Sequence, residues 1–98
     1  MNKEKEYIVY LIRHRNINEY TKIGYTGDLN KRIKSLQTAS PTGIEVIRTY
    51  TFTKRRAEQV EQGLHRKFNF KHSHLEWFKL TDEDIKFIDD FVDKIKNK

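Results

Sequence analysis

Glu61 lies on the inward side of a predicted helix, where a carboxylate needs a partner. Four apolar residues of this helix, Ala57, Val60, Leu64 and Phe68, span an arc of about 80° at roughly 100° per residue, and Glu61 falls inside that arc. Burying a lone carboxylate is costly, so Glu61 is expected to meet a cation, a hydrogen-bond donor or a metal ion. The alternative is a structural glutamate that a lysine or arginine neutralises.

Three other polar residues are predicted to border the core. Arg32 follows Leu29 by three positions and precedes Leu36 by four, so it lies at the margin of an apolar helix face. Its stem could equally pack along the surface with the guanidinium in water. Tyr10 and Lys22 belong to successive predicted strands and share one surface if those strands pair as a hairpin. A packed tyrosine and a solvated lysine are the alternatives.

Weaker candidates for ligand binding lie elsewhere in the chain. His65 follows Glu61 by four residues, which indicates either a polar pair or a phosphate contact. Three basic residues at 54–56 start a helix, where the dipole disfavours cations, so an external anion or a solvated face is expected there. The two histidines within residues 72–74 form a poor zinc pattern in a chain without cysteine.

The pattern of apolar and turn residues predicts α/β or α+β packing, with a small sheet covered by helices. The predicted order is a strand at 7–12, a turn at 16–19, a strand at 20–24, a helix from 28 to about 38, a loop at 39–43 around Pro41, a strand at 44–52, a helix from 54 to about 68, a short extended piece at 76–80, and a last helix from about 82 to 97. The first strand is apolar throughout and is expected to be buried on both faces.

Side-chain caps and apolar faces support the three helices. Asp28 and Thr53 are predicted N-caps, and residues 81–84 resemble a capping box with Asp in place of Glu. The inward residues expected on the first and last helices are Leu29, Ile33, Leu36, Ile85, Ile88, Val92 and Ile95. In the third strand, Ile44 and Val46 are expected to face inward.

The composition indicates a small globular domain that folds without disulfides. Of its 98 residues, 36% are hydrophobic and 12% aromatic, and cysteine is absent, which excludes thiolate catalysis and cysteine zinc sites. No apolar stretch is long enough for a membrane span, and no signal-peptide pattern follows the first residues. A single cytoplasmic domain, residues 1–98, with no membrane partner is therefore expected.

The charge distribution predicts a polyanionic partner. Twenty Lys and Arg residues exceed fourteen Asp and Glu residues, for a net charge of +6. Six of the acidic residues lie within 81–93, so the basic excess is concentrated in residues 1–80. Nucleic acid is the commonest partner of such a surface, and a protein that is merely basic is the alternative.

Five short motifs in order resemble the GIY-YIG nuclease superfamily, most closely its small phage-type branch. They are Ile-Val-Tyr at 8–10, Lys-Ile-Gly at 22–24, Asp-Leu-Asn-Lys-Arg at 28–32, Ala-Glu-Gln-Val-Glu-Gln-Gly-Leu-His at 57–65, and Glu-Trp-Phe at 76–78. The chain departs from the name motifs at Ile8, Val9 and Lys22, and the late asparagine of the superfamily has no counterpart. The resemblance covers residues 7 to about 80. It implies a small, mainly antiparallel three-stranded sheet flanked by helices, with residues 82–97 as an added helix.

The resemblance also implies hydrolysis of DNA phosphodiesters with one Mg²⁺, which Mn²⁺ can replace. Glu61 corresponds to the metal ligand, which suits an ion that accepts one carboxylate plus waters and phosphate oxygens. Arg32 corresponds to the catalytic arginine and would donate to the phosphate. Tyr10 would act as general base with Lys22 as the cation beside it, or Lys22 would activate the water itself; the two assignments stay open.

The predicted nuclease surface uses basic residues around these motifs. Six residues are expected to contact DNA: Lys31, Lys34, Lys54, Arg55, Arg56 and His65. Because little chain lies outside the motifs, specificity is expected to be low or to come from a homodimer or a protein partner. The alternative to a phage or mobile-element endonuclease is a degenerate relative that binds nucleic acid or a protein.

Overall fold

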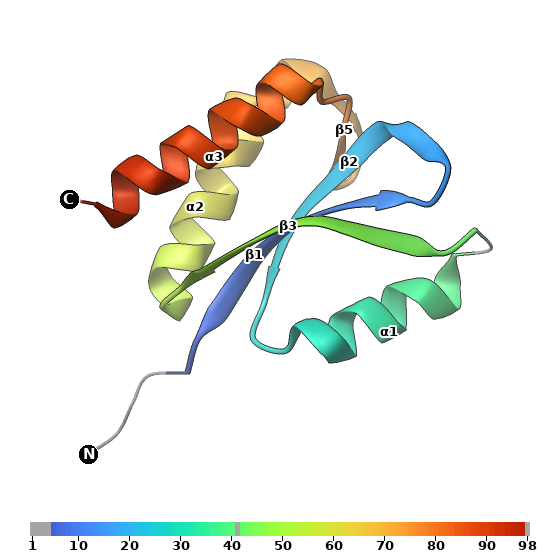
Figure 1. The fold of residues 1–98 in the computed structure, drawn as a ribbon, viewed down its shortest axis with the longest axis horizontal. Helices are drawn as coiled ribbons and strands as arrows, with labels where there is room; N and C mark the ends of the chain where they lie inside the picture. The colour runs from blue at the N-terminus through green and yellow to red at the C-terminus, as the bar shows by residue number, and fades with distance from the viewer. Residues whose placement is uncertain (1–4, 41, 98) are drawn as a thin grey trace.

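The computed structural model describes residues 5–40 and 42–97. Two pairs of consecutive strands, one single strand and three α-helices follow one another along the chain (Figure 1). The elements are β1 (Tyr7–His14), β2 (Ile17–Thr26), α1 (Leu29–Ala39), β3 (Ile44–Phe52), α2 (Lys54–Lys67), a short 3₁₀ turn η1 (Asn69–Lys71), β4 (His72–His74), β5 (Trp77–Phe78) and α3 (Asp82–Lys96). The predicted order of the main elements is confirmed. The predicted loop joins α1 to β3, although Pro41 itself lies outside the described residues.

The described strands form one antiparallel sheet in the order β3-β1-β2-β5-β4. The antiparallel α+β prediction is confirmed, but the number of strands is wrong: the sheet has five strands, not three. The two additional strands are only three and two residues long. Pieces this short carry no readable alternation of apolar and polar residues, so the sequence pattern shows β5 only as an extended piece and misses β4.

The hairpin of β1 and β2 is longer and tighter than predicted. Its turn is Arg15–Asn16 rather than residues 16–19, and Ile17 already pairs with His14 across the ladder. Asn16 has a φ of 68°, a left-handed conformation that asparagine tolerates better than most side chains. The longer strands carry the ladder as far as Ile8 and Thr26, so β1 and β2 hold a fixed register next to the site described below.

All three helices begin at the predicted caps. Asp28 accepts a hydrogen bond from the backbone of Lys31, and Thr53 accepts one from the backbone of Arg56. At α3, Thr81 and Asp84 bond reciprocally to each other's backbone, which confirms the capping box with Asp in place of Glu.

The sheet is covered on both faces. On one face, α2 and α3 pack their buried apolar residues against Val9, Leu11 and Ile23. On the other face, α1 packs its predicted apolar stripe against Tyr10, Ile12 and Ile44. Figure 1 shows α1 on one side of the sheet and α2 with α3 on the other. The prediction of a first strand buried on both faces is confirmed.

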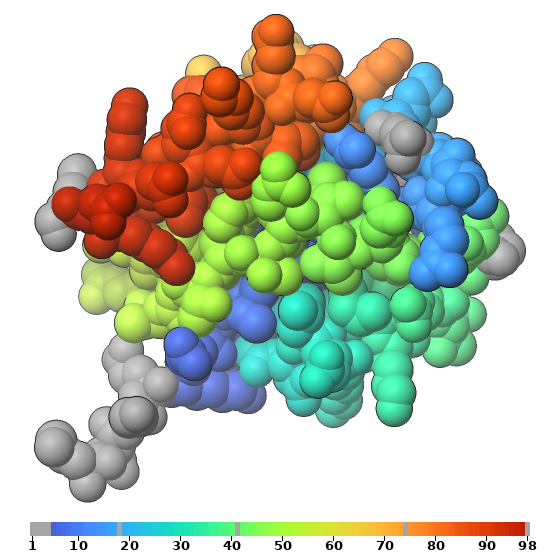
Figure 2. All heavy atoms as spheres, in the orientation of Figure 1, coloured from blue at the N-terminus to red at the C-terminus, as the bar shows by residue number. Residues whose placement is uncertain are grey.

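Strand β3 forms the outer edge of the sheet, at the opposite end from β4 and β5. In Figure 2 its residues (green) make up the surface between α3 above and α1 below. Ile44 is buried as predicted. Val46 is 39% exposed, so the prediction that it faces inward is wrong. Val46 and Arg48 pair with the consecutive residues Ile12 and Leu11 of β1, so Ile47 between them is an extra residue. This bulge interrupts the alternation along β3. In the part of the chain that is described, no helix combines the length and apolarity needed to cross a membrane.

Candidate active site at the edge of strand β2

Tyr10 and Arg32 meet at the interface between β1 and α1. The Tyr10 side chain is fully buried, and its hydroxyl accepts a hydrogen bond of 3.2 Å from Nη1 of Arg32. Gly24 is the partner of Tyr10 in the β1–β2 ladder. A β-carbon on Gly24 would lie 2.4 Å from the tyrosine hydroxyl oxygen, so the missing side chain makes the room that the phenol occupies.

The surroundings of Tyr10 keep its proton in place. Burial raises the pKa of Tyr10, the hydrogen bond and charge of Arg32 lower it, and the carboxylates of Glu76 and Glu61 raise it again, with a net upward shift. Tyr10 is therefore a neutral phenol at neutral pH. Because Arg32 donates to the hydroxyl oxygen, the hydroxyl hydrogen is available for an acceptor outside this pair.

Lys22 lies on the same face of the sheet, one ladder step from Tyr10. Lys22 pairs with Ile12 and Gly24 pairs with Tyr10, which confirms that a hairpin brings Tyr10 and Lys22 to one surface. Nζ of Lys22 donates to Oε2 of Glu76 at 2.7 Å, and only 12% of the lysine side chain is exposed. Lys22 is thus held in an ion pair rather than solvated.

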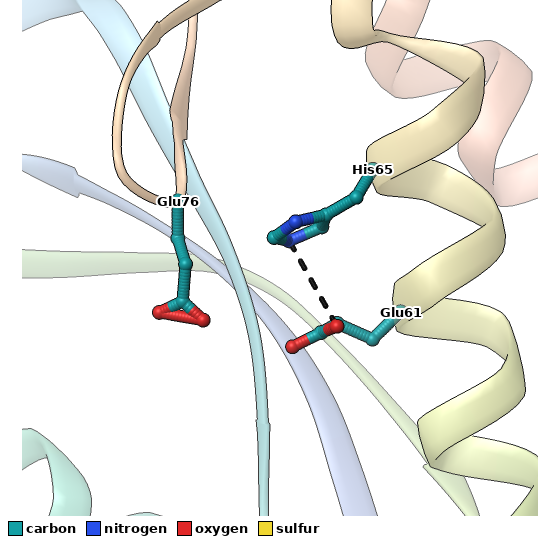
Figure 3. Close-up of side chains that lie close together, drawn as sticks. All are labelled: Glu61, His65 and Glu76. Carbon is teal, nitrogen blue, oxygen red and sulfur yellow. Dashed lines mark ion pairs between the residues drawn. The ribbon is translucent and has the colours of Figure 1, made fainter.

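Glu61, His65 and Glu76 form a cluster beside β2. Glu61 and His65 come from successive turns of α2, and Glu76 faces them from the segment that joins β4 to β5 (Figure 3). One ligand atom from each residue lies within 4.8 Å of the others, a separation that a single metal ion can span. Glu76 is thereby placed next to β2, the strand that carries Lys22.

Glu61 is turned inward as its helix position predicts. Its side chain is 12% exposed, and Nε2 of His65 lies 4.0 Å from its Oε1. Burial raises the pKa of Glu61, with His65 and Lys22 lowering it and Glu76 and Glu58 raising it, for a net upward shift. Among the described residues, no lysine or arginine forms an ion pair with Glu61, so the purely structural alternative lacks its neutralising partner.

His65 is oriented by the backbone of β2. Its Nε2 lies 2.8 Å from the carbonyl oxygen of Ile23. A carbonyl only accepts, so Nε2 carries a hydrogen and donates it to Ile23.

These donors fit a hard divalent cation better than a transition metal. Mg²⁺ prefers carboxylate and water oxygens and is satisfied by one or two protein ligands. Glu61 offers a carboxylate without a lysine or arginine partner in the described structure, and an imidazole that already donates to Ile23 is a poor ligand for Mg²⁺.

Comparison with known families places the chain in one of them. Residues 7–96 match the T5orf172 domain. The chain belongs to the T5orf172 family. This family is a phage-associated, nuclease-like domain. Neither a curated protein nor a solved structure matches the chain.

In this T5orf172 domain, the basic residues predicted to contact DNA occupy two places. Lys31 lies with Arg32 and Thr26 in a hollow at the start of α1, and Lys34 is exposed on the same helix. Lys54 and Arg55 lie in a second hollow with Lys5, Tyr7 and Glu58, and Arg56 is exposed beside it. His65 differs from the other five, because it belongs to the carboxylate cluster and bonds to a backbone carbonyl.

The sequence does not reveal one residue of the candidate site. Glu76 stands out only as the first residue of the Glu-Trp-Phe motif, which assigns it no role. Its ion pair with Lys22 joins residues 54 positions apart. The motif was the available signal, but its partner depends on the pairing of β5 with β2.

Proposed function

We propose that this T5orf172 domain is a Mg²⁺-dependent DNA endonuclease of the GIY-YIG type. The observation that carries the proposal is the convergence of four polar side chains from separate elements around one strand edge. Tyr10 bonds to Arg32, Lys22 lies on the same face, and the charge of Glu61 acts on the pKa of Tyr10. Perturbed titratable groups that gather at one place are typical of active sites.

The proposed reaction is hydrolysis of a phosphodiester. A water oxygen bonds to phosphorus, one phosphorus–ester oxygen bond breaks, and the products are a phosphate monoester and a free hydroxyl. Arg32 offers the planar guanidinium donors that match phosphate oxygens as negative charge develops. Glu61 would hold Mg²⁺, which when bound stabilises charge on the phosphate and on the leaving oxygen.

The attacking water must lose a proton, and two residues can serve. Tyr10 has a raised pKa, so its neutral hydroxyl would donate toward a phosphate oxygen unless the bound substrate favours the phenolate. Lys22 is the second candidate and is held next to it on β2. Comparing Tyr10→Phe with Lys22→Met over a range of pH separates the two, because only loss of the base removes the corresponding limb of the rate profile.

The substrate is proposed to be duplex DNA, bound through phosphate contacts of the basic residues on α1 and at the start of α2. Phosphate contacts position a duplex without specifying its sequence, so sequence preference would be low or would come from a second copy or a protein partner.

The decisive experiment is cleavage of plasmid DNA by the wild type and by Glu61→Gln, with Mg²⁺ or with EDTA. Glu61→Gln keeps the shape and removes the charge, so the cleavage rate should fall by about 10²-fold or more while DNA binding persists. Glu58→Gln is the matched control, because Glu58 lies three residues earlier on α2 and bonds to Tyr25 instead. Equal cleavage by wild type and Glu61→Gln contradicts the assignment. Binding without cleavage by the wild type supports a degenerate binding module.

A further inference from the structure

The turn between β4 and β5 presents Glu76 to Lys22. Leu75 precedes Glu76 and has a φ of 53°, a left-handed conformation that a branched side chain rarely adopts. Leu75 is also 70% exposed, so neither packing nor local geometry favours a leucine there. Backbone conformations of this kind persist where the surrounding structure determines them, and they gather at functional sites.

The backbone of Glu76 is fixed to β2 as well. Its carbonyl oxygen accepts a hydrogen bond of 3.1 Å from the backbone nitrogen of Ile23, next to Lys22. The following residue, Trp77, is the ladder partner of Lys22. The glutamate therefore cannot shift along β2 without breaking this pairing.

Two interactions restrain the Lys22 ammonium. Oε2 of Glu76 accepts from Nζ at 2.7 Å, and the Trp77 ring centroid lies 5.8 Å from Nζ. Trp77 in turn stacks on His14, with ring centroids 4.7 Å apart and planes 10° apart. A lysine side chain has four rotatable bonds, so these contacts select one position from many.

We propose that Glu76 is a positioning residue that holds the Lys22 ammonium beside Tyr10 and Glu61, and that it acts through Lys22 rather than as a metal ligand. This proposal rests on the proposed nuclease function. Oε2 of Glu76 is already engaged by Nζ, whereas Glu61 has no such partner among the described residues. A lysine that is already held in place loses less conformational entropy when the reaction begins than a free lysine does.

The first test measures whether Glu76 holds Lys22, without any use of activity. Acetylation of each lysine is followed by mass spectrometry in the wild type, Glu76→Ala and Glu76→Gln. Lys22 should react several-fold faster in Glu76→Ala, with Glu76→Gln in between because its amide oxygen still accepts. Lys79 is 66% exposed and serves as an internal reference whose labelling should not change. Equal labelling of Lys22 in all three proteins overturns the proposal.

The second test separates positioning from metal binding. Mn²⁺ binding to the DNA-free protein is measured from the free-ion resonance signal, with the fluorescence of Trp77, the single tryptophan, as a second reporter. Glu76→Ala should bind Mn²⁺ within about twofold of the wild type, whereas loss of a carboxylate ligand should weaken binding by about tenfold or more. A loss of that size assigns Glu76 to the metal and overturns the proposal.

The third test is a double-mutant cycle on cleavage rate. Glu76→Ala should slow cleavage by about 10- to 100-fold in the wild-type background but by less than about twofold in Lys22→Met, since the two residues act as a unit. Equal slowing in both backgrounds indicates a structural role and overturns the proposal, and thermal melting identifies any variant that fails to fold. If the wild type does not cleave DNA, the proposed function fails, while the labelling and Mn²⁺ results still decide the role of Glu76.

Discussion

Gly24 is the ladder partner of Tyr10, and the absence of its side chain is what lets the phenol reach Arg32. A β-carbon at position 24 would lie 2.4 Å from the hydroxyl oxygen and 2.5 Å from the carbon that carries it. The glycine of the Lys-Ile-Gly motif therefore has a packing reason. It makes room for a neighbouring side chain rather than for a special backbone conformation.

The first prediction concerns Gly24→Ala. The methyl group should displace the Tyr10 ring and lower the free energy of unfolding by about 1–3 kcal/mol, as overpacking does in other cores. DNA cleavage should fall as well, because the Tyr10–Arg32 hydrogen bond is lost. Urea unfolding measures the first effect and plasmid cleavage the second. An active, fully stable Gly24→Ala would contradict the close contact.

Gly63→Ala tests the same substitution where space is free. Gly63 lies within α2, and a β-carbon there would have no neighbour within 4 Å. Alanine favours a helix over glycine by about 0.5–1 kcal/mol, so the free energy of unfolding should rise by that amount. The two variants should thus differ in sign when measured side by side, which separates local packing from a general effect of the added methyl.

Arg32→Lys should lower activity without lowering stability. Lysine retains the charge but loses the planar fork that reaches the Tyr10 hydroxyl and a phosphate together. Cleavage should slow by about 10²-fold, the usual cost of a lost transition-state donor. The unfolding midpoint should barely move, because Arg32 is exposed. Arg66→Lys, an exposed arginine near the end of α2, is the control and should retain activity. A less stable Arg32→Lys with normal specific activity would favour the surface alternative.

The basic start of α2 should determine part of the salt dependence of DNA binding. Replacing Lys54, Arg55 and Arg56 by alanine should weaken binding to unrelated duplexes by similar factors and reduce the log–log salt slope by about 0.9 for each lost phosphate contact. Titrations of labelled duplex at several salt concentrations measure both quantities.

The control for that experiment changes three exposed lysines outside α1 and α2, Lys79, Lys86 and Lys94, to alanine. Helix α3 packs on the same face of the sheet as α2, so the control measures what the loss of three positive charges elsewhere on the protein costs by itself (Figure 1). This control should lose less affinity than the α2 variant. Equal salt slopes for the wild type and the α2 variant would remove the start of α2 from the DNA-binding surface.

Asp84 should make the stability of α3 depend on pH. Burial raises the pKa of Asp84, but hydrogen bonds from Lys71 and Thr81 outweigh it, and the net shift is downward. A lowered pKa means that the ionised form stabilises the fold above the usual aspartate range, and that this stability is lost as pH falls through the folded-state pKa. Asp84→Asn should therefore cost about 1 kcal/mol at pH 7, and the cost should shrink as pH falls below the usual aspartate range. Asp90→Asn, an exposed change on the same helix, should follow the wild-type pH dependence. Thermal melting across this range measures the difference.

Local patterns in the sequence were sufficient to predict the three helices and to place Glu61 on the inward side of α2. The caps at Asp28, Thr53 and Thr81 act over three residues, and the helical faces repeat every three or four residues. Both signals are complete within one element, so no tertiary contact is needed to read them. The apolar run of β1 also lies within one element, and it correctly predicts that this strand is buried on both faces.

Contacts between distant segments could be decided only by the tertiary structure. The sequence reveals neither the bulge at Ile47 nor the pairing of β4 with β5, because ladder register depends on a partner strand elsewhere in the chain. The same holds for the Lys22–Glu76 ion pair. Taken alone, each of the two residues is expected to be a solvated charge. The pairing of β5 with β2 brings Nζ of Lys22 to 2.7 Å from Oε2 of Glu76, although 54 positions of sequence separate the two residues.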